Sequence, residues 1–273
     1  MRAFRTWRRR SRRLWRGVRR LRLPPVVWAV VAAAALLGAG VTWQVAHKPT
    51  ELLGLVAPAA PKSPEVTWAE YGPLFEAHST EIVRPQLLAA LAQVESAGDP
   101  LARTYWRWRW SWNPLDVYAP ASSAVGLMQM TDGNFADASR LCIHDHGVAD
   151  RGALLDPGGC WFNALYFRSV PSHAIEMTAA WLHRSVEEIL ATEKIPRASP
   201  ERKQRLAAVV HLCGRERAAS FARRGFWIVP GERCGDHDLA RYVARVEVYA
   251  ATFRRVAVTA PAQAAPRPLP RAR

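Results

Sequence analysis

Acidic residues are missing where the chain is most basic. The first 22 residues contain eleven arginines but neither aspartate nor glutamate. The remaining residues hold 27 basic and 23 acidic side chains, so most of the formal charge of +15 comes from this terminal segment. A nucleic-acid-binding domain is typically strongly basic. The folded part of this chain is not, because most of the positive charge lies in the terminal segment. A nucleic-acid-binding arm at residues 1–22 is the alternative, but we favour a role in membrane topology and expect no nucleic-acid partner.

Charge is absent altogether from residues 23–46, which read LPPVVWAVVAAAALLGAGVTWQVA. A helix needs about 20 apolar residues to cross a bilayer, and Trp28 and Trp43 lie near the two ends, as interfacial aromatic residues do. No clean small-x-small cleavage site follows, which favours an uncleaved anchor over a signal peptide. The preceding arginines predict a single pass through a membrane, with a cytoplasmic N-terminus and everything after His47 outside.

Cysteine is scarce, and no Cys-x-x-Cys pair occurs. The four cysteines all follow the apolar segment, and an even number in an exported domain indicates two disulfides. Pairing neighbours in sequence gives one of three possible connectivities, Cys142–Cys160 and Cys213–Cys234. Zinc held by Cys142, His144, His146 and Cys160 is the alternative, but we expect neither metal nor cofactor.

No internal repeat is present, and proline-rich stretches delimit one domain. We predict five segments, which are a cytoplasmic arginine-rich tail (1–22), a transmembrane anchor (23–46), a proline/alanine-rich linker (47–66), one folded domain (67–257) and a disordered proline-rich tail (258–273). Apolar residues at helical spacing predict a mainly α-helical domain.

One segment departs from helical periodicity. Tryptophan recurs at every second position across Trp106–Trp112, before Asn113 and Pro114, which predicts a strand and a turn. The four tryptophans on one face suit either an aromatic platform for sugars or the buried side of a hairpin. We favour packing against the helices, because large aromatic side chains mostly serve as hydrophobic bulk.

A glutamate ends an apolar helical run. Leu87, Leu88 and Leu91 precede Glu95 at spacings that put all four side chains on one helix face. Burial disfavours the charged form of a carboxylic acid, and a protonated carboxylic acid can donate to a glycosidic oxygen. A solvated residue at a helix end is the alternative for this glutamate considered alone. The segment Gly126-Leu127-Met128-Gln129 adds the second signal.

Together, Glu95-Ser96 and Gly126-Leu127-Met128-Gln129 resemble the lysozyme-like lytic transglycosylases. Those enzymes have a helix ending in Glu-Ser and a Gly-Leu-Met-Gln segment along the same cleft. Leu154-Leu155-Asp156-Pro157 is similar to the family's Asp-Pro helix opening, and residues 242–249, YVARVEVY, are similar to its closing helix. The resemblance covers about residues 70–255.

The sequence departs from the family at two places. Where the family has Ala-Tyr-Asn-Ala-Gly, with a tyrosine that helps hold the glutamate, this chain has Val210-His211-Leu212-Cys213-Gly214. The family's sugar-binding serine matches neither Ser122 nor Ser123 uniquely. These changes affect the expected subsites more than the expected reaction.

The resemblance implies a lysozyme-like fold with a small β-hairpin and cleavage of peptidoglycan between N-acetylmuramic acid and N-acetylglucosamine. Glu95 is the implied catalytic acid, and the product carries a 1,6-anhydro end. The implied substrate-binding residues are Ser96, Ser122, Ser123, Gly126, Leu127, Met128, Gln129, His211 and Tyr242. A hydrolytic lysozyme, with a second carboxylate from Asp99, Asp116 or Asp132, and a non-catalytic peptidoglycan-binding scaffold are the alternatives. No protein partner in a cell-wall or secretion machine is identified.

Overall fold

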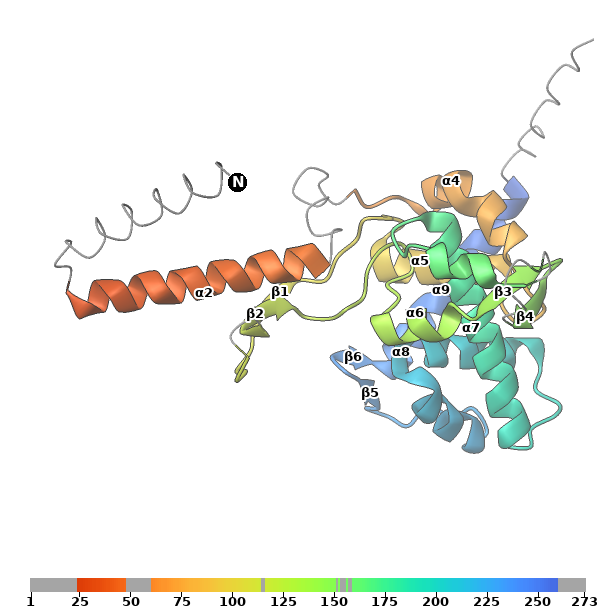
Figure 1. Cartoon of the computed structure of the whole chain (residues 1–273). Coiled ribbons are helices and arrows are strands. Elements are labelled where there is room, and N and C mark those ends of the chain that lie inside the picture. Colours follow the sequence, from red (N-terminus) through yellow and green to blue (C-terminus); the bar gives the residue numbers. More distant parts are fainter. Residues whose placement is uncertain are drawn as a thin grey trace, which may run out of the picture. The chain divides into compact units, whose positions relative to one another are not determined.

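The computed structural model describes residues 24–47, 60–113, 116–150, 152, 156 and 159–259. They belong to two compact units, one with the N-terminal helix and residues 106–121, the other with residues 60–105 and 122–259. Figure 1 labels the elements of both. The predicted tail 1–22, most of the linker 47–66 and nearly all of the tail 258–273 lie outside the described residues.

The first unit consists of one helix and one hairpin. Helix α2 spans Pro25–His47, close to the predicted segment 23–46, and Pro25–Trp43 is long and apolar enough to cross a membrane. Strands β1 (Trp106–Trp108) and β2 (Tyr118–Pro120) pair antiparallel, and β2 packs against α2. The strand and turn predicted from the tryptophan alternation are therefore present.

The predicted packing of the tryptophans is wrong. Trp108, Trp110 and Trp112 are 64%, 106% and 105% exposed. Trp106 and Trp108 do share a face, since both rings contact Tyr118, but the alternating pattern arises whether or not another element covers that face. The hydrophobic bulk of the domain comes from its helices instead.

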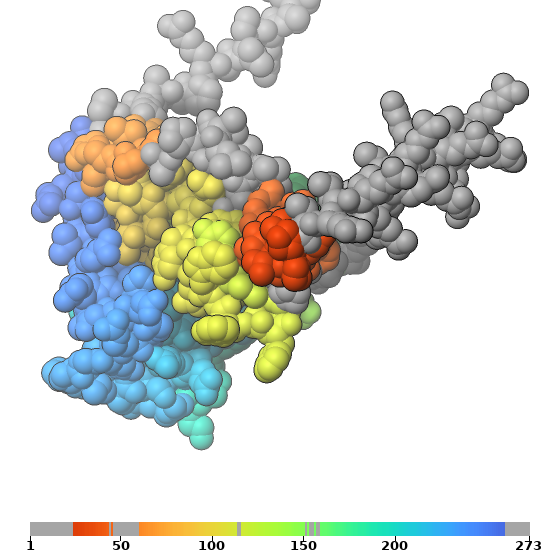
Figure 2. Space-filling view, turned by 90° about the vertical axis from the view of Figure 1, so that its left-hand side faces the viewer, coloured from red at the N-terminus to blue at the C-terminus, as the bar shows by residue number. Residues whose placement is uncertain are grey.

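Three helices that pack on one another form the first part of the core of the second unit. Helix α5 (Pro85–Ser96) packs against both α4 (Pro64–Ala77) and α9 (Leu239–Thr259). Its residues from Leu87 to Ala92 are buried, because apolar side chains cover its whole circumference there. Figure 2 shows the surfaces of α4 (orange) and α9 (blue) side by side. This packing fixes the position of the C-terminal end of α5.

A second pair of long helices completes the core. Helices α7 (Pro171–Thr192) and α8 (Pro200–Arg223) pack together, and each begins with a proline, which suits the first turn. Within α8 the backbone leaves helical geometry at Gly214, where φ is 78°. Glycine tolerates this left-handed conformation because it has no Cβ.

Short elements complete the fold. They are α6 (Asp132–Ala138), β3 (Leu141–His144) paired antiparallel with β4 (Gly147–Asp150), the 3₁₀ helix η2 (Trp161–Leu165), and β5 (Arg233–Cys234) paired with β6 (His237–Asp238). The described residues are thus mainly helical with small strand pairs, as predicted.

Both predicted disulfides are present. Cys142 of β3 is bonded to Cys160, and Cys213 of α8 is bonded to Cys234 of β5, with Cα–Cα distances of 5.2 and 5.3 Å. All four cysteines of the chain are therefore paired. The zinc alternative loses its thiolate ligands, because Cys142 and Cys160 are bonded to each other.

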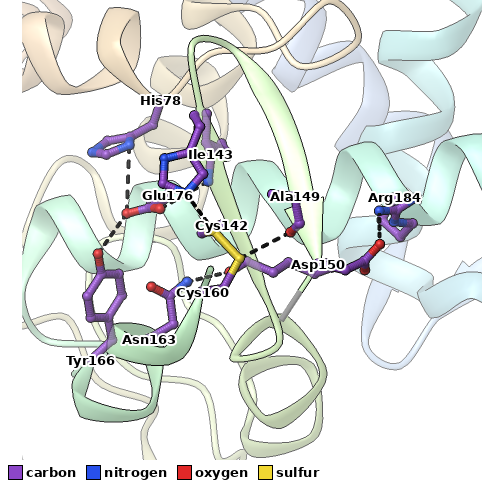
Figure 3. The surroundings of a disulfide bond; sticks show 12 residues. His78, Cys142, Ile143, Ala149, Asp150, Cys160, Asn163, Tyr166, Glu176 and Arg184 are labelled. Carbon is purple, nitrogen blue, oxygen red and sulfur yellow. Dashed lines mark hydrogen bonds and ion pairs between the residues drawn. A yellow bond between two sulfur atoms is a disulfide. The ribbon is translucent and has the colours of Figure 1, made fainter. Parts of the chain in front are cut away.

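A buried carboxylate connects α7 to the first disulfide region (Figure 3). Glu176 is 6% exposed and accepts hydrogen bonds from the Ile143 amide at 3.1 Å and the Tyr166 hydroxyl at 3.0 Å. His78 Nδ1 lies 3.9 Å from the same carboxylate. Burial, with the charge of Glu176, raises the pKa of Tyr166 to about 12, so this hydroxyl remains a donor. Glu176 therefore holds β3 on α7.

Replacing Glu176 with alanine should lower the free energy of unfolding by about 2–4 kcal/mol, because two half-buried donors lose their buried acceptor. Chemical denaturation measures the change. Glu188→Ala is the matched control on the same helix. That carboxylate pairs with Arg215 while 51% exposed, so its loss should cost less than about 1 kcal/mol. Equal losses for the two variants would contradict the structural role of Glu176.

Candidate active site

Glu95 lies in the last turn of α5, where the apolar face of the helix reaches the surface. Leu87, Leu88 and Leu91 on that face are at most 2% exposed, whereas the Glu95 side chain is 19% exposed. The helix ends directly after it, with Ala97 and Gly98 at φ of 51° and 75°. Left-handed residues commonly end helices in this way. The leucines thus anchor α5 and leave the carboxylate at the edge of the core.

Tyr242 of α9 holds this carboxylate. Its hydroxyl donates to Glu95 Oε1 over 2.6 Å. Burial, and then the charge of Glu95, raise the pKa of Tyr242 well above its ordinary value, so the hydroxyl stays protonated at physiological pH. The bond therefore fixes one oxygen of the glutamate, across 147 residues of sequence.

His211 of α8 is the second neighbour of the carboxylate. Its Nε2 lies 3.5 Å from Glu95 Oε1, and its side chain is 7% exposed. Burial lowers the pKa of His211, although the charge of Glu95 opposes this shift. A neutral imidazole at neutral pH follows. Its Nδ1 is buried and has no hydrogen-bond partner among the described residues.

The second motif supports the end of α5 from one side. Ser96 Oγ donates to the Leu127 carbonyl over 2.8 Å, and Gln129 Nε2 donates to the Gly126 and Ala102 carbonyls over 2.9 and 3.0 Å. Gly126 has φ of 79°, and a Cβ there would lie 2.3 Å from the Arg168 carbonyl oxygen. Only glycine fits this close approach. The two motifs therefore meet in space, as the family resemblance implied.

A cleft of about 440 Å³ opens beside Glu95. It is lined by Pro61, Gln93, Val94, Glu95, Ser96, Ala97, Asp99, Ala102, Arg103, Arg245 and Tyr249. Arg103 and Arg245 are exposed, so the cleft combines a carboxylic acid with two surface cations. Such a cleft suits a polar ligand that carries carboxylates.

Most of the predicted substrate-binding residues do not line this cleft. Leu127 and Met128 are 0% exposed, so their side chains have no surface to offer a sugar. The hydroxyl of Ser122 accepts from the Ala124 amide and that of Ser123 accepts from the Asp132 amide, so both shape the loop. These residues support the site from within the fold.

Sequence reasoning also missed residues of the cleft. Arg245 and Tyr249 lie on α9 three and seven positions after Tyr242, which places them on the same helix face. The helical spacing of these two residues from Tyr242 could have identified them as neighbours of the site. Arg103 and Gln93 gave no such signal.

Comparison with known families agrees with this geometry. Residues 72–159 match the model of the transglycosylase SLT domain. The match supports a lytic transglycosylase-type catalytic domain in this part of the chain. It includes Glu95 and Gly126–Gln129 and ends before α7, α8 and α9. His211 and Tyr242, the neighbours of Glu95 on α8 and α9, lie outside the matched residues and are known from the geometry alone. No curated protein sequence matches the chain.

Replacing Tyr242 with phenylalanine should lower kcat on glycan strands by about ten- to a hundredfold. A hydrogen bond to a charged group contributes about 1.5–3 kcal/mol, and about 1.4 kcal/mol is a factor of ten. Tyr166→Phe is the matched control, because that hydroxyl also donates to a glutamate, Glu176, outside the cleft. It should reduce stability while leaving kcat per folded molecule unchanged. Equal kcat values for wild type and Tyr242→Phe would contradict the role of the bond.

The lowered pKa of His211 predicts an acid-sensitive fold. The unfolded chain protonates this histidine near its ordinary pKa of 6.5, and the folded chain does so only at lower pH. Stability is therefore lost as the pH falls below about 6.5. His211→Gln should make the melting temperature fall less steeply between neutral pH and about pH 5. His78 and His173 are half-buried, and burial lowers their pKa values too, so they retain part of the slope. An unchanged slope in the variant would contradict this assignment.

Proposed function

We propose that this chain is a membrane-anchored lytic transglycosylase of peptidoglycan. The observation that carries the proposal is the Glu95 carboxyl group, held by Tyr242 at the edge of a cleft in a domain that matches the transglycosylase SLT family. The bond cleaved is the β-1,4 linkage between N-acetylmuramic acid and N-acetylglucosamine. The product carries a 1,6-anhydromuramyl end.

The reaction requires one residue that changes roles. Protonated Glu95 donates to the glycosidic oxygen as the bond from that oxygen to muramyl C1 breaks. The 2-acetamido oxygen of the substrate stabilises the cation that develops at C1. Ionised Glu95 then takes the proton of the muramyl C6 hydroxyl, whose oxygen bonds to C1. Glu95 ends protonated again, and no water is consumed.

The contacts of Glu95 suggest which oxygen carries the proton. Tyr242 donates to Oε1, and His211 lies nearest to the same oxygen. We therefore assign proton transfer to Oε2. Burial keeps His211 neutral at neutral pH, so it places no positive charge beside the proposed acid.

The cleft also fits the charge of the substrate. Peptidoglycan strands carry carboxylates on their lactyl-linked peptides, and the exposed guanidinium groups of Arg103 and Arg245 line the cleft. Guanidinium groups bind carboxylates in a bidentate manner. We propose that these arginines position the peptide-bearing muramyl unit.

We further propose that α2 anchors the chain in the bacterial inner membrane, with the N-terminus in the cytoplasm and the catalytic domain in the periplasm. The length and apolar composition of Pro25–Trp43 support the anchor. The two disulfides support an oxidising compartment for the domain. A signal sequence is the alternative role for this helix.

A hydrolytic lysozyme would use a second carboxylate, and Asp99 lines the same cleft. Its two oxygens, however, accept backbone amides, from Leu101 at 2.9 Å and from Ala60 at 3.3 Å. Asp132 is paired with Arg168. Both aspartates therefore have structural partners, which favours the transglycosylase reaction.

Digestion of purified sacculi tests the proposed function. The full chain should release muropeptides that are one water lighter than hydrolysed ones, as mass spectrometry measures. Glu95→Gln should reduce release by about a hundredfold or more, because the only proposed proton donor is lost. Glu188→Gln, an exposed acid outside the cleft, is the control and should act like wild type. Hydrated products would establish the lysozyme alternative, and full activity of Glu95→Gln would contradict Glu95 catalysis.

A further inference from the structure

The tryptophan hairpin, residues 106–120, has no part in the proposed reaction. Its residues do not line the Glu95 cleft. It nevertheless presents the most exposed large apolar side chains of the described chain, Trp110 at 106% and Trp112 at 105%. An exposed tryptophan leaves a large ring in water, so several together indicate a surface that binds something.

The hairpin combines aromatic side chains with cations at alternate positions. Trp106 and Trp108 lie opposite Pro120 and Tyr118 in the strand register, and both indole rings contact the Tyr118 ring, with centroids 5.2 and 4.8 Å apart. Arg107 and Arg109 occupy the alternate positions and are exposed, and Arg107 points to the opposite face of β1. Segments that combine indole rings with cations are typical of the interface of a bilayer.

The hairpin belongs to the same compact unit as α2. Strand β2 packs against that helix, and Ala119 of β2 is 2% exposed. Burial of α2 is confined to its C-terminal end, where Gly40 is buried and Val45 is half-buried among the described side chains. The other side chains described there, from Val26 to Trp43, are exposed.

This packing sets the depth of the hairpin. Gly40 is seven residues before the end of α2 at His47, a distance of about 10 Å along a helix axis. If α2 spans the bilayer, whose hydrocarbon core is about 30 Å thick, Gly40 lies one to two helical turns inside the boundary between hydrocarbon and headgroups, on the side where α2 ends. Trp43, three residues closer to that end, lies nearer the boundary.

We propose that the tryptophan hairpin lies in the headgroup region of the bilayer that α2 spans, on the periplasmic side. The indole rings of Trp108, Trp110 and Trp112 enter the interface, and Arg107 and Arg109 bind lipid phosphates. The proposal rests on the anchor proposed for α2. A sugar platform is the competing role, but the cleft with the proposed catalytic acid is lined by residues of the other unit.

Fluorescence quenching by brominated phospholipids tests this placement. The full chain is reconstituted in vesicles of phosphatidylethanolamine and phosphatidylglycerol, with bromines either near the headgroup or near the chain end. The combined variant Trp108→Phe, Trp110→Phe and Trp112→Phe removes three emitters and keeps aromatic rings in place. We expect the emission that this variant loses to be quenched more strongly by bromines near the headgroup than by bromines near the chain end. Trp227→Phe removes an exposed tryptophan of the other unit, 66% exposed, and should lose only unquenched emission.

A second pair of substitutions separates this proposal from the anchor. Trp28→Phe with Trp43→Phe reports on α2 itself. Quenching that depends on Trp28 and Trp43 but not on the hairpin would leave the anchor intact and overturn the interfacial hairpin. Loss of quenching at both sites would overturn both. Hairpin emission that responds to soluble glycan fragments and not to bromolipid would establish the sugar platform instead.

Discussion

The site depends on one hydrogen bond, from the Tyr242 hydroxyl of α9 to Glu95 Oε1 at the end of α5. The bond needs the two helices side by side in a fixed register. That register comes from the buried residues of α5, which pack against α9 on one side and α4 on the other. The chemistry is therefore positioned by the hydrophobic core, and only the last turn of α5 reaches the cleft.

The other contacts of the site follow from the same constraint. Ser96 bonds to the Leu127 carbonyl, and Gly126 lets that segment approach the Arg168 backbone. His211 comes within 3.5 Å of the carboxylate from α8. Three separate parts of the chain thus converge on the last turn of α5. His211 approaches from α8, and Tyr242 supplies a phenolic hydroxyl from α9.

Much of this arrangement could be predicted from local patterns. Leucine spacing placed Glu95 on an apolar helix face, and the motif at Gly126–Gln129 identified the segment beside it. The number and spacing of the cysteines gave both disulfide pairs. The first two signals are carried by residues close together in sequence. The third depends on the number of cysteines, since four cysteines allow only three connectivities.

What could not be predicted depends on contacts between distant elements. Nothing in the sequence around Tyr242 shows that its hydroxyl faces a residue 147 positions earlier. Leu127 and Met128 were expected in the cleft, yet apolar side chains next to a core are more stable inside it. Tryptophans alternate in the same way on a buried face and on an exposed one. Their exposure could therefore be learned only from the structure.

The account makes one central claim, that Glu95 meets the glycosidic oxygen in the cleft beside α9. A crystal structure of Glu95→Gln with a bound muropeptide strand tests it most directly. The account predicts a bridging oxygen about 3 Å from the amide of residue 95, with the muramyl peptide near Arg245 and Tyr249. A strand bound elsewhere on the domain, with the residue 95 side chain out of reach, would contradict it.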